Sequence, residues 1–90
     1  MNEVRNDPTH SRYVLDVEGQ QAIAAYRRDG DVLTFTHTQV PEALQGRGVG
    51  SALVKGALAD VRRAGLTIIP HCPFVAAYLE RHPEEGDLLA

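Results

Sequence analysis

The sequence contains a single cysteine, Cys72, and no long hydrophobic run. One cysteine cannot form a disulfide framework, which favours a reducing compartment. No apolar run approaches the roughly 20 residues that a membrane-spanning helix needs. The polar first segment, MNEVRNDPTHSR, also lacks the apolar core of a signal peptide. We therefore expect a cytoplasmic protein that has no membrane partner.

The chain also lacks an excess of positive charge. Its 9 Lys and Arg residues stand against 12 Asp and Glu residues, for a formal net charge of −3. This balance argues against a general nucleic-acid-binding protein, which carries a basic face. With 90 residues, 43% of them hydrophobic, the composition is that of one small globular domain. A domain of this size buries only about 60% of its unfolded surface. We therefore expect a minimal site, or one completed by a second subunit, in a monomer or weak homodimer.

The first half of the chain predicts a β-meander. We assign residues 1–9 to a flexible N-terminal lead-in and residues 10–90 to the domain. Stretches rich in β-forming residues predict three strands, at residues 12–17, 22–27 and 32–40. The links between them, EGQQ and RDGD, are short enough for antiparallel pairing.

Alternation along the third predicted strand separates two sets of side chains. It places Leu33, Phe35 and His37 on one face. The threonines between and after them, at positions 34, 36 and 38, are then expected on the other face. Pro41 cannot donate to the sheet and is expected to end the strand.

The second half predicts two helices around one strand. Apolar residues at helical spacing predict a helix that begins near Val49 or Gly50 and ends near Gly65. The apolar run LTIIP predicts a central strand covered on both faces. Pro73 suits the first position of a second, short helix. A right-handed crossover makes the last strand parallel to the third. The fold class is therefore α+β, with a mixed sheet and the order β-β-β-α-β-α.

A glycine-rich loop, QGRGVG, precedes the first helix. Its glycines let backbone N–H groups approach a ligand, and the helix start leaves further donors unpaired. Arg47 can add a charged bond to a phosphate. The loop lacks the lysine of a P-loop, and Ser51 stands where the dinucleotide fingerprint needs its third glycine. It fits the pattern Q/R-x-x-G-x-G/A through Gln45, Gly48 and Gly50.

The sequence resembles the GCN5-related N-acetyltransferases, and within them the small single-domain YjdJ-type branch. The loop and the stretches FTHTQVP, GRGVGSALV and PHCPFVAAY carry the resemblance, which extends from Tyr13 to Pro83. It implies acetyl-CoA (coenzyme A) as the cofactor and acetyl transfer to an unidentified amine. The coenzyme contacts that it implies are Thr38, Gln39, Val40, Gln45, Gly46, Arg47, Gly48, Val49, Gly50 and Ser51.

Acetyl transfer needs a base for the amine, a donor for the oxyanion and an acid for the leaving thiolate. His37 and Cys72 are the candidate catalytic residues. His37 would be the base, and Cys72 would be the acid, an acyl nucleophile or a buried packing residue. Many members of the resembled family carry a tyrosine on the second helix as the acid, and Tyr78 is close to that place. His71, Cys72 and His82 lack zinc-ligand spacing, so no metal is expected.

The resemblance also implies a gap and an open acceptor site. The strands before the loop and after its helix splay apart in this family, and Pro41 fits that point. Larger members have two helices between their first two strands, where this chain has only EGQQ. Two alternatives to an enzyme stay open. One is a non-catalytic coenzyme A or acyl-CoA binding module or sensor, and the other is an interaction domain with purely structural glycines.

Overall fold

The computed structural model describes residues 3–90, which form one five-stranded sheet and two α-helices. In spatial order the strands are β1 (Arg5–Asp7), β2 (Arg12–Val17), β3 (Gln20–Asp29), β4 (Val32–Gln39) and β5 (Thr67–Pro70). The helices are α1 (Val49–Arg63) and α2 (Pro73–Arg81), and the 3₁₀ turns are η1 (Pro8–His10), η2 (Glu42–Leu44) and η3 (Pro83–Leu88). β1 to β4 pair antiparallel, and β4 pairs with β5 in parallel. The expected α+β class and mixed sheet are confirmed.

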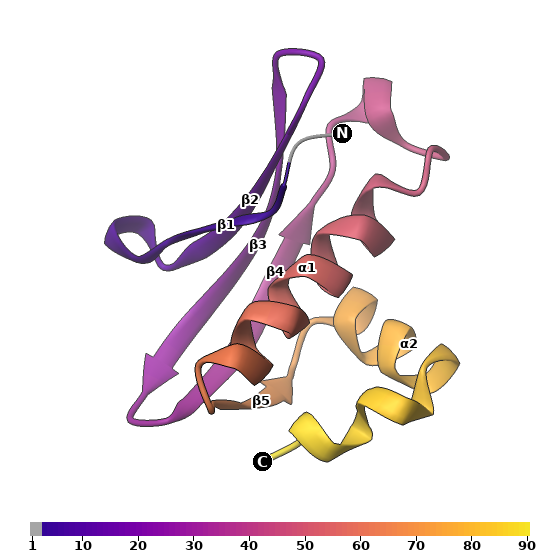
Figure 1. The fold of residues 1–90 in the computed structure, drawn as a ribbon. Coiled ribbons are helices and arrows are strands. Elements are labelled where there is room, and N and C mark those ends of the chain that lie inside the picture. The colour runs from indigo at the N-terminus through magenta and orange to yellow at the C-terminus, as the bar shows by residue number, and fades with distance from the viewer. Residues whose placement is uncertain (1–2) are drawn as a thin grey trace.

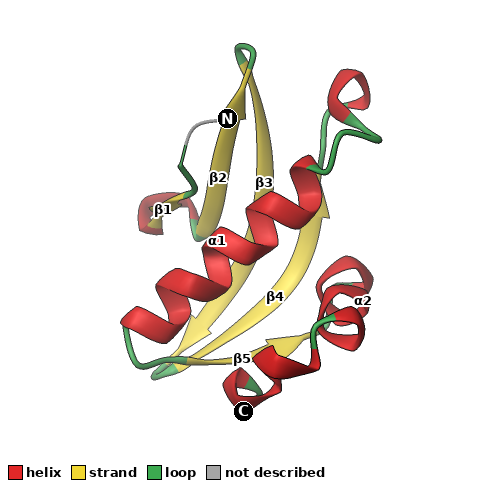
Figure 2. Ribbon diagram, turned by 45° about the vertical axis from the view of Figure 1, so that its right-hand side comes forward, coloured by secondary structure: helices red, strands yellow, loops and turns green. Residues whose placement is uncertain are grey.

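Both helices lie on one face of the sheet (Figure 1). α1 crosses that face diagonally, and α2 lies beside it, next to β4 and β5 (Figure 2). The apolar stripe of α1, which includes Leu53, Ala57 and Val61, is fully buried against the sheet. In the part of the chain that the structure describes, no helix is long and apolar enough to cross a membrane.

The first strand, β1, lies inside the segment that the sequence assigned to a lead-in. Arg5–Asp7 pairs antiparallel with the beginning of β2. These three residues are polar and mostly exposed, so they show no alternation from which a strand could be predicted. The flexibility of the lead-in stays a prediction, and its first two residues lie outside the described range.

The last strand, β5, is an edge strand, so the prediction of a central strand covered on both faces was wrong. Ile68 is fully buried, whereas the side chain of Ile69 on the other face is 37% exposed. Beyond β5, Leu89 forms an isolated parallel bridge to Ile68, and the N–H of Ala90 donates to the carbonyl of Ile68 at 2.9 Å. An apolar run of this length predicts a strand, but its place in the sheet depends on partners far away in sequence.

A bulge in β4 reverses the expected alternation of its side chains. The pairing with β3 passes from Phe35 directly to His37, and Thr36 has no partner in the register. Such an extra residue shifts all following side chains to the opposite face. Thr38 therefore joins Phe35 on the face that carries the helices, and His37 lies exposed on the other face. The predicted grouping of Leu33, Phe35 and His37 was wrong for His37.

Tyr13 links the sheet to α1 through a partly buried hydrogen bond. Its hydroxyl donates to the Asp60 carboxylate at 2.7 Å, and its ring forms a cluster of three with those of Tyr26 and Phe35. Burial raises the pKa of the Tyr13 hydroxyl well above its usual value, and the bond to Asp60 raises it further. The folded state therefore favours the neutral phenol.

The stability of the protein is expected to fall as the pH rises through the alkaline range. A tyrosine with a raised folded-state pKa contributes stability that is complete below its unfolded pKa of about 10. That stability is lost as the pH rises through the folded pKa. Tyr13→Phe should flatten this dependence and cost about 1–3 kcal/mol near neutral pH, because the charged Asp60 carboxylate loses a hydrogen bond. Urea midpoints of both proteins between pH 7 and 11 test this, and parallel curves would contradict it.

Candidate functional site

A gap opens between β4 and β5 at the carboxyl ends of the two strands. The parallel pairing ends at Phe35 and Pro70, and the N–H of Cys72 makes the last link, to the Phe35 carbonyl at 2.8 Å. Beyond this point the remaining residues of β4 pair only with β3 within residues 3–90. The expected splaying of the strands is present, but it begins at Phe35 and Pro70 rather than at Pro41. Pro70 lacks the donor that would extend the ladder.

A cavity of about 430 Å³ adjoins this gap, between the glycine loop, the start of α1 and α2. Its volume is in the range of small-molecule and cofactor sites. The residues that line it come from β4, the loop and both helices: Thr38, Val40, Leu44, Gln45, Gly46, Gly48, Val49, Gly50, Ser51, Phe74 and Arg81. The structure thus brings together all of the predicted coenzyme contacts except Gln39 and Arg47.

The loop presents a row of backbone donors beside the cavity. Gly48 adopts a left-handed conformation, with a φ of 74°, and precedes α1 without a side-chain cap. The first N–H of α1 that donates to a backbone carbonyl is that of Ala52, whose acceptor is the Gly48 carbonyl at 3.0 Å. Among the described residues, the N–H groups from Gly46 to Ser51 have no acceptor. These donors and the positive end of the α1 dipole suit an anion.

Arg47 does not take part in the cavity. Its guanidinium forms an ion pair with Glu18 in the turn between β2 and β3. The prediction that Arg47 binds a phosphate therefore has no support in this arrangement. Gln39 is exposed at the end of β4 and is not part of the lining either.

Cys72 is buried and reaches the cavity through Thr38. Its side chain is only 3% exposed, and its sulfur lies 3.1 Å from the Thr38 hydroxyl, which lines the cavity. Cys72 precedes α2, but its side chain forms no capping bond there. The family resemblance implied Thr38 as a coenzyme contact, but the sequence did not predict its side-chain contact with Cys72, because the bulge in β4 is not visible in the pattern.

The two predicted catalytic residues are not brought together. His37 lies on the sheet face away from the cavity, whereas Cys72 lies beside it. The tyrosine considered as an acid, Tyr78, does not line the cavity either. It is buried in the core, and its ring stacks on that of His82. The Phe74 ring, also from α2, packs on Gly50 of α1. Burial raises the pKa of Tyr78, and Glu85 and Glu84 raise it further.

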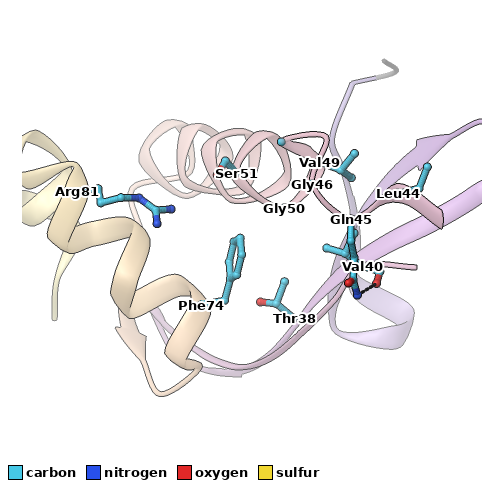
Figure 3. A pocket seen from close by; sticks show the side chains of 11 residues that line it. Thr38, Val40, Leu44, Gln45, Gly46, Val49, Gly50, Ser51, Phe74 and Arg81 are labelled. Carbon is cyan, nitrogen blue, oxygen red and sulfur yellow. Dashed lines mark hydrogen bonds between the residues drawn. The ribbon is translucent and has the colours of Figure 1, made fainter. Parts of the chain in front are cut away.

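Three lining residues, Leu44, Phe74 and Arg81, were not found from the sequence. Figure 3 shows Phe74 standing between Thr38 and the start of α1, and Arg81 extending from α2 toward the same space. An arginine in the last turn of a helix is common because its positive charge stabilises the negative end of the helix dipole. The position of Arg81 therefore did not indicate a binding residue. Within residues 3–90, no group of three or more His, Cys, Asp or Glu side chains could hold a metal ion.

Known proteins are similar to this chain in sequence, and one solved structure is similar to it in fold. The profile of a family described as GCN5-related N-acetyl-transferase matches residues 12–88. Protein NATD1 of Gallus gallus is 27% identical over 84 residues, which are 90% of this chain and 76% of that protein. Protein NATD1 of Homo sapiens is 28% identical over 83 residues, 89% and 74% of the two chains. The NMR solution structure of a GCN5-like protein from Staphylococcus aureus has a TM-score of 0.73 at 28% identity, covering 98% of this chain and 87% of the other.

Proposed function

Because the chain belongs to the GCN5-related N-acetyltransferase family, we propose that it binds acetyl-CoA in the cavity and transfers the acetyl group to an amine. The observation that carries the proposal is the row of unpaired N–H groups from Gly46 to Ser51 beside the gap after β4. These donors would hold the pyrophosphate, and the pantetheine arm would run along Thr38 and Val40 into the gap. A cytoplasmic location stays a prediction from the single cysteine.

The proposed reaction uses the Thr38–Cys72 pair at the thioester. The acceptor amine attacks the carbonyl carbon, the carbon–sulfur bond then breaks, and the leaving thiolate takes a proton. Thr38 lines the cavity and contacts the Cys72 sulfur, so it can deliver that proton while it takes one from Cys72. After coenzyme A leaves, water in the cavity returns a proton to the Cys72 thiolate through the Thr38 hydroxyl. The acceptor amine gives up its proton to water or to a base on the acceptor side. His37 is not included, because it lies on the opposite face of the sheet.

The acceptor side of the site is proposed to be open. β2 and β3 are joined only by the turn at Glu18 and Gly19, so no helices of the described chain wall off an acceptor pocket. This suits an exposed amine on a polymer or a small polyamine.

A second candidate is an acyl-CoA binding module without turnover. The observation that favours it is the burial of Cys72, which contacts the cavity only through Thr38. Release of free thiol from acetyl-CoA in the presence of an amine panel separates the two candidates. Binding of acetyl-CoA without thiol release would favour the binding module. Thiol release that depends on the amine would establish the enzyme.

Acetyl-CoA is expected to stabilise the protein against heat. A ligand at about one hundred times its Kd adds about 2.7 kcal/mol to the stability of the native state. For a domain of this size, that raises the Tm by roughly 10 °C or more. Thermal unfolding with increasing acetyl-CoA measures the shift, and NAD serves as the control nucleotide, for which no shift is expected. An unchanged Tm at millimolar acetyl-CoA would contradict the proposal and favour structural glycines.

A further inference from the structure

Arg81 supplies the charge of the cavity. Among the lining residues it is the single charged side chain, and no carboxylate lines the cavity to neutralise it. It comes from the last turn of α2, whereas the glycine loop precedes α1. Figure 3 shows its guanidinium directed from α2 toward the space between the helices, on the other side of Phe74 from Gln45.

The guanidinium of Arg81 is free to bind a ligand. Within residues 3–90 it makes no ion pair or hydrogen bond, although Arg47, Arg62 and Arg63 are each paired with a carboxylate. An arginine presents its donors in a planar fork that matches the oxygens of a phosphate. The cavity therefore has two separate places for anions, the N–H row of the loop and the guanidinium of Arg81.

Coenzyme A carries two separate anionic groups, a diphosphate and a phosphate monoester on the ribose 3′ oxygen. The loop donors suit the diphosphate, which connects to the pantetheine arm. We propose that Arg81 binds the 3′-phosphate, and that it makes the site select coenzyme A over 3′-dephospho-coenzyme A. Phe74, between the two anion places, offers an apolar face to the adenine. This inference rests on the proposed function, because it takes coenzyme A as the ligand.

Isothermal titration with coenzyme A and with 3′-dephospho-coenzyme A tests the assignment. The wild type should bind coenzyme A about tenfold more tightly than the dephospho form, as expected for a charge-assisted bond. Arg81→Gln should remove this preference by weakening coenzyme A binding about tenfold, and it should leave the affinity for the dephospho form unchanged. The preference of the wild type should also shrink at high salt.

Arg27→Gln is the matched control. Arg27 is an exposed arginine on β3, it makes no ion pair within the described residues, and it does not line the cavity. This variant should keep the wild-type preference. An equal loss for both ligands in Arg81→Gln, or no loss for either, would overturn the role of Arg81 while the coenzyme site stands. Failure of the wild type to bind either ligand would overturn the proposed function and this inference with it.

Discussion

Gly48→Glu is expected to weaken acetyl-CoA binding by at least about a hundredfold, which corresponds to about 2.7 kcal/mol. The residue lines the cavity, and a Cβ at this position would meet no atom within 4 Å. The new side chain can therefore be accommodated, but it places a carboxylate beside the N–H groups that are proposed to hold the pyrophosphate. The new carboxylate repels the pyrophosphate of acetyl-CoA. It also accepts hydrogen bonds from the N–H groups that would otherwise bind the pyrophosphate. Isothermal titration measures the loss.

Gly65→Glu is a control matched in backbone geometry. Gly65 has a φ of 73° against 74° for Gly48, and open space also surrounds its Cβ position. Both variants therefore carry the strain of a side chain in the left-handed region, about 1–2 kcal/mol. Because Gly65 follows α1 and does not line the cavity, its variant should bind acetyl-CoA normally. Equal binding by the two variants would show that the loop is not the coenzyme site.

Cys72→Ala is expected to lower the rate of acetyl transfer by about a hundredfold or more while leaving the affinity for acetyl-CoA unchanged. A group that moves a proton in the transition state contributes on this scale. Cys72 does not line the cavity, so its loss removes no contact with the bound coenzyme. Amine-dependent thiol release gives the rate, and titration gives the affinity. A full rate in this variant would reduce Cys72 to a packing residue.

Thr38→Val separates a proton route from simple packing. The valine keeps the shape of the side chain but lacks the hydroxyl that lies 3.1 Å from the sulfur. If the two groups act as one unit, each single variant loses about as much rate as the double variant. Thr36→Val is the control, because this threonine on the same strand is exposed and its hydroxyl donates to the carbonyl of Ala25, away from Cys72. Additive losses of rate would contradict the Thr38–Cys72 route.

Local patterns predicted those parts of the site that depend on local structure. The helical spacing of Leu53, Ala57 and Val61 predicted α1, and the glycines before it predicted a loop that lines the cavity at the first turn of that helix. The loop donors face the cavity because a helix start orients them, and this needs no distant partner. Most of the predicted coenzyme contacts therefore line the cavity.

Several features that the sequence missed depend on distant partners. The bulge at Thr36 exists only in the pairing with β3, and it exchanges the faces of His37 and Thr38. Arg47 forms an ion pair with Glu18 because the fold brings the turn between β2 and β3 near the glycine loop. Arg81 lines the cavity because α2 packs beside α1. The hydrophobic periodicity of α2 alone does not predict this packing. Interactions of this kind are set by the tertiary fold and leave no local pattern.

The two edges of the sheet bear on the behaviour of the protein at high concentration. Unpaired strand edges are templates onto which another chain can add a strand, and this is a common route to aggregation. Here β5 is covered by the bridge from Leu89 and the bond from Ala90. On the other edge, β1 is a short strand of Arg5–Asp7, followed directly by Pro8. Charged and short edges of this kind resist strand addition, so within the described chain neither β1 nor β5 offers much of a template for edge-to-edge aggregation.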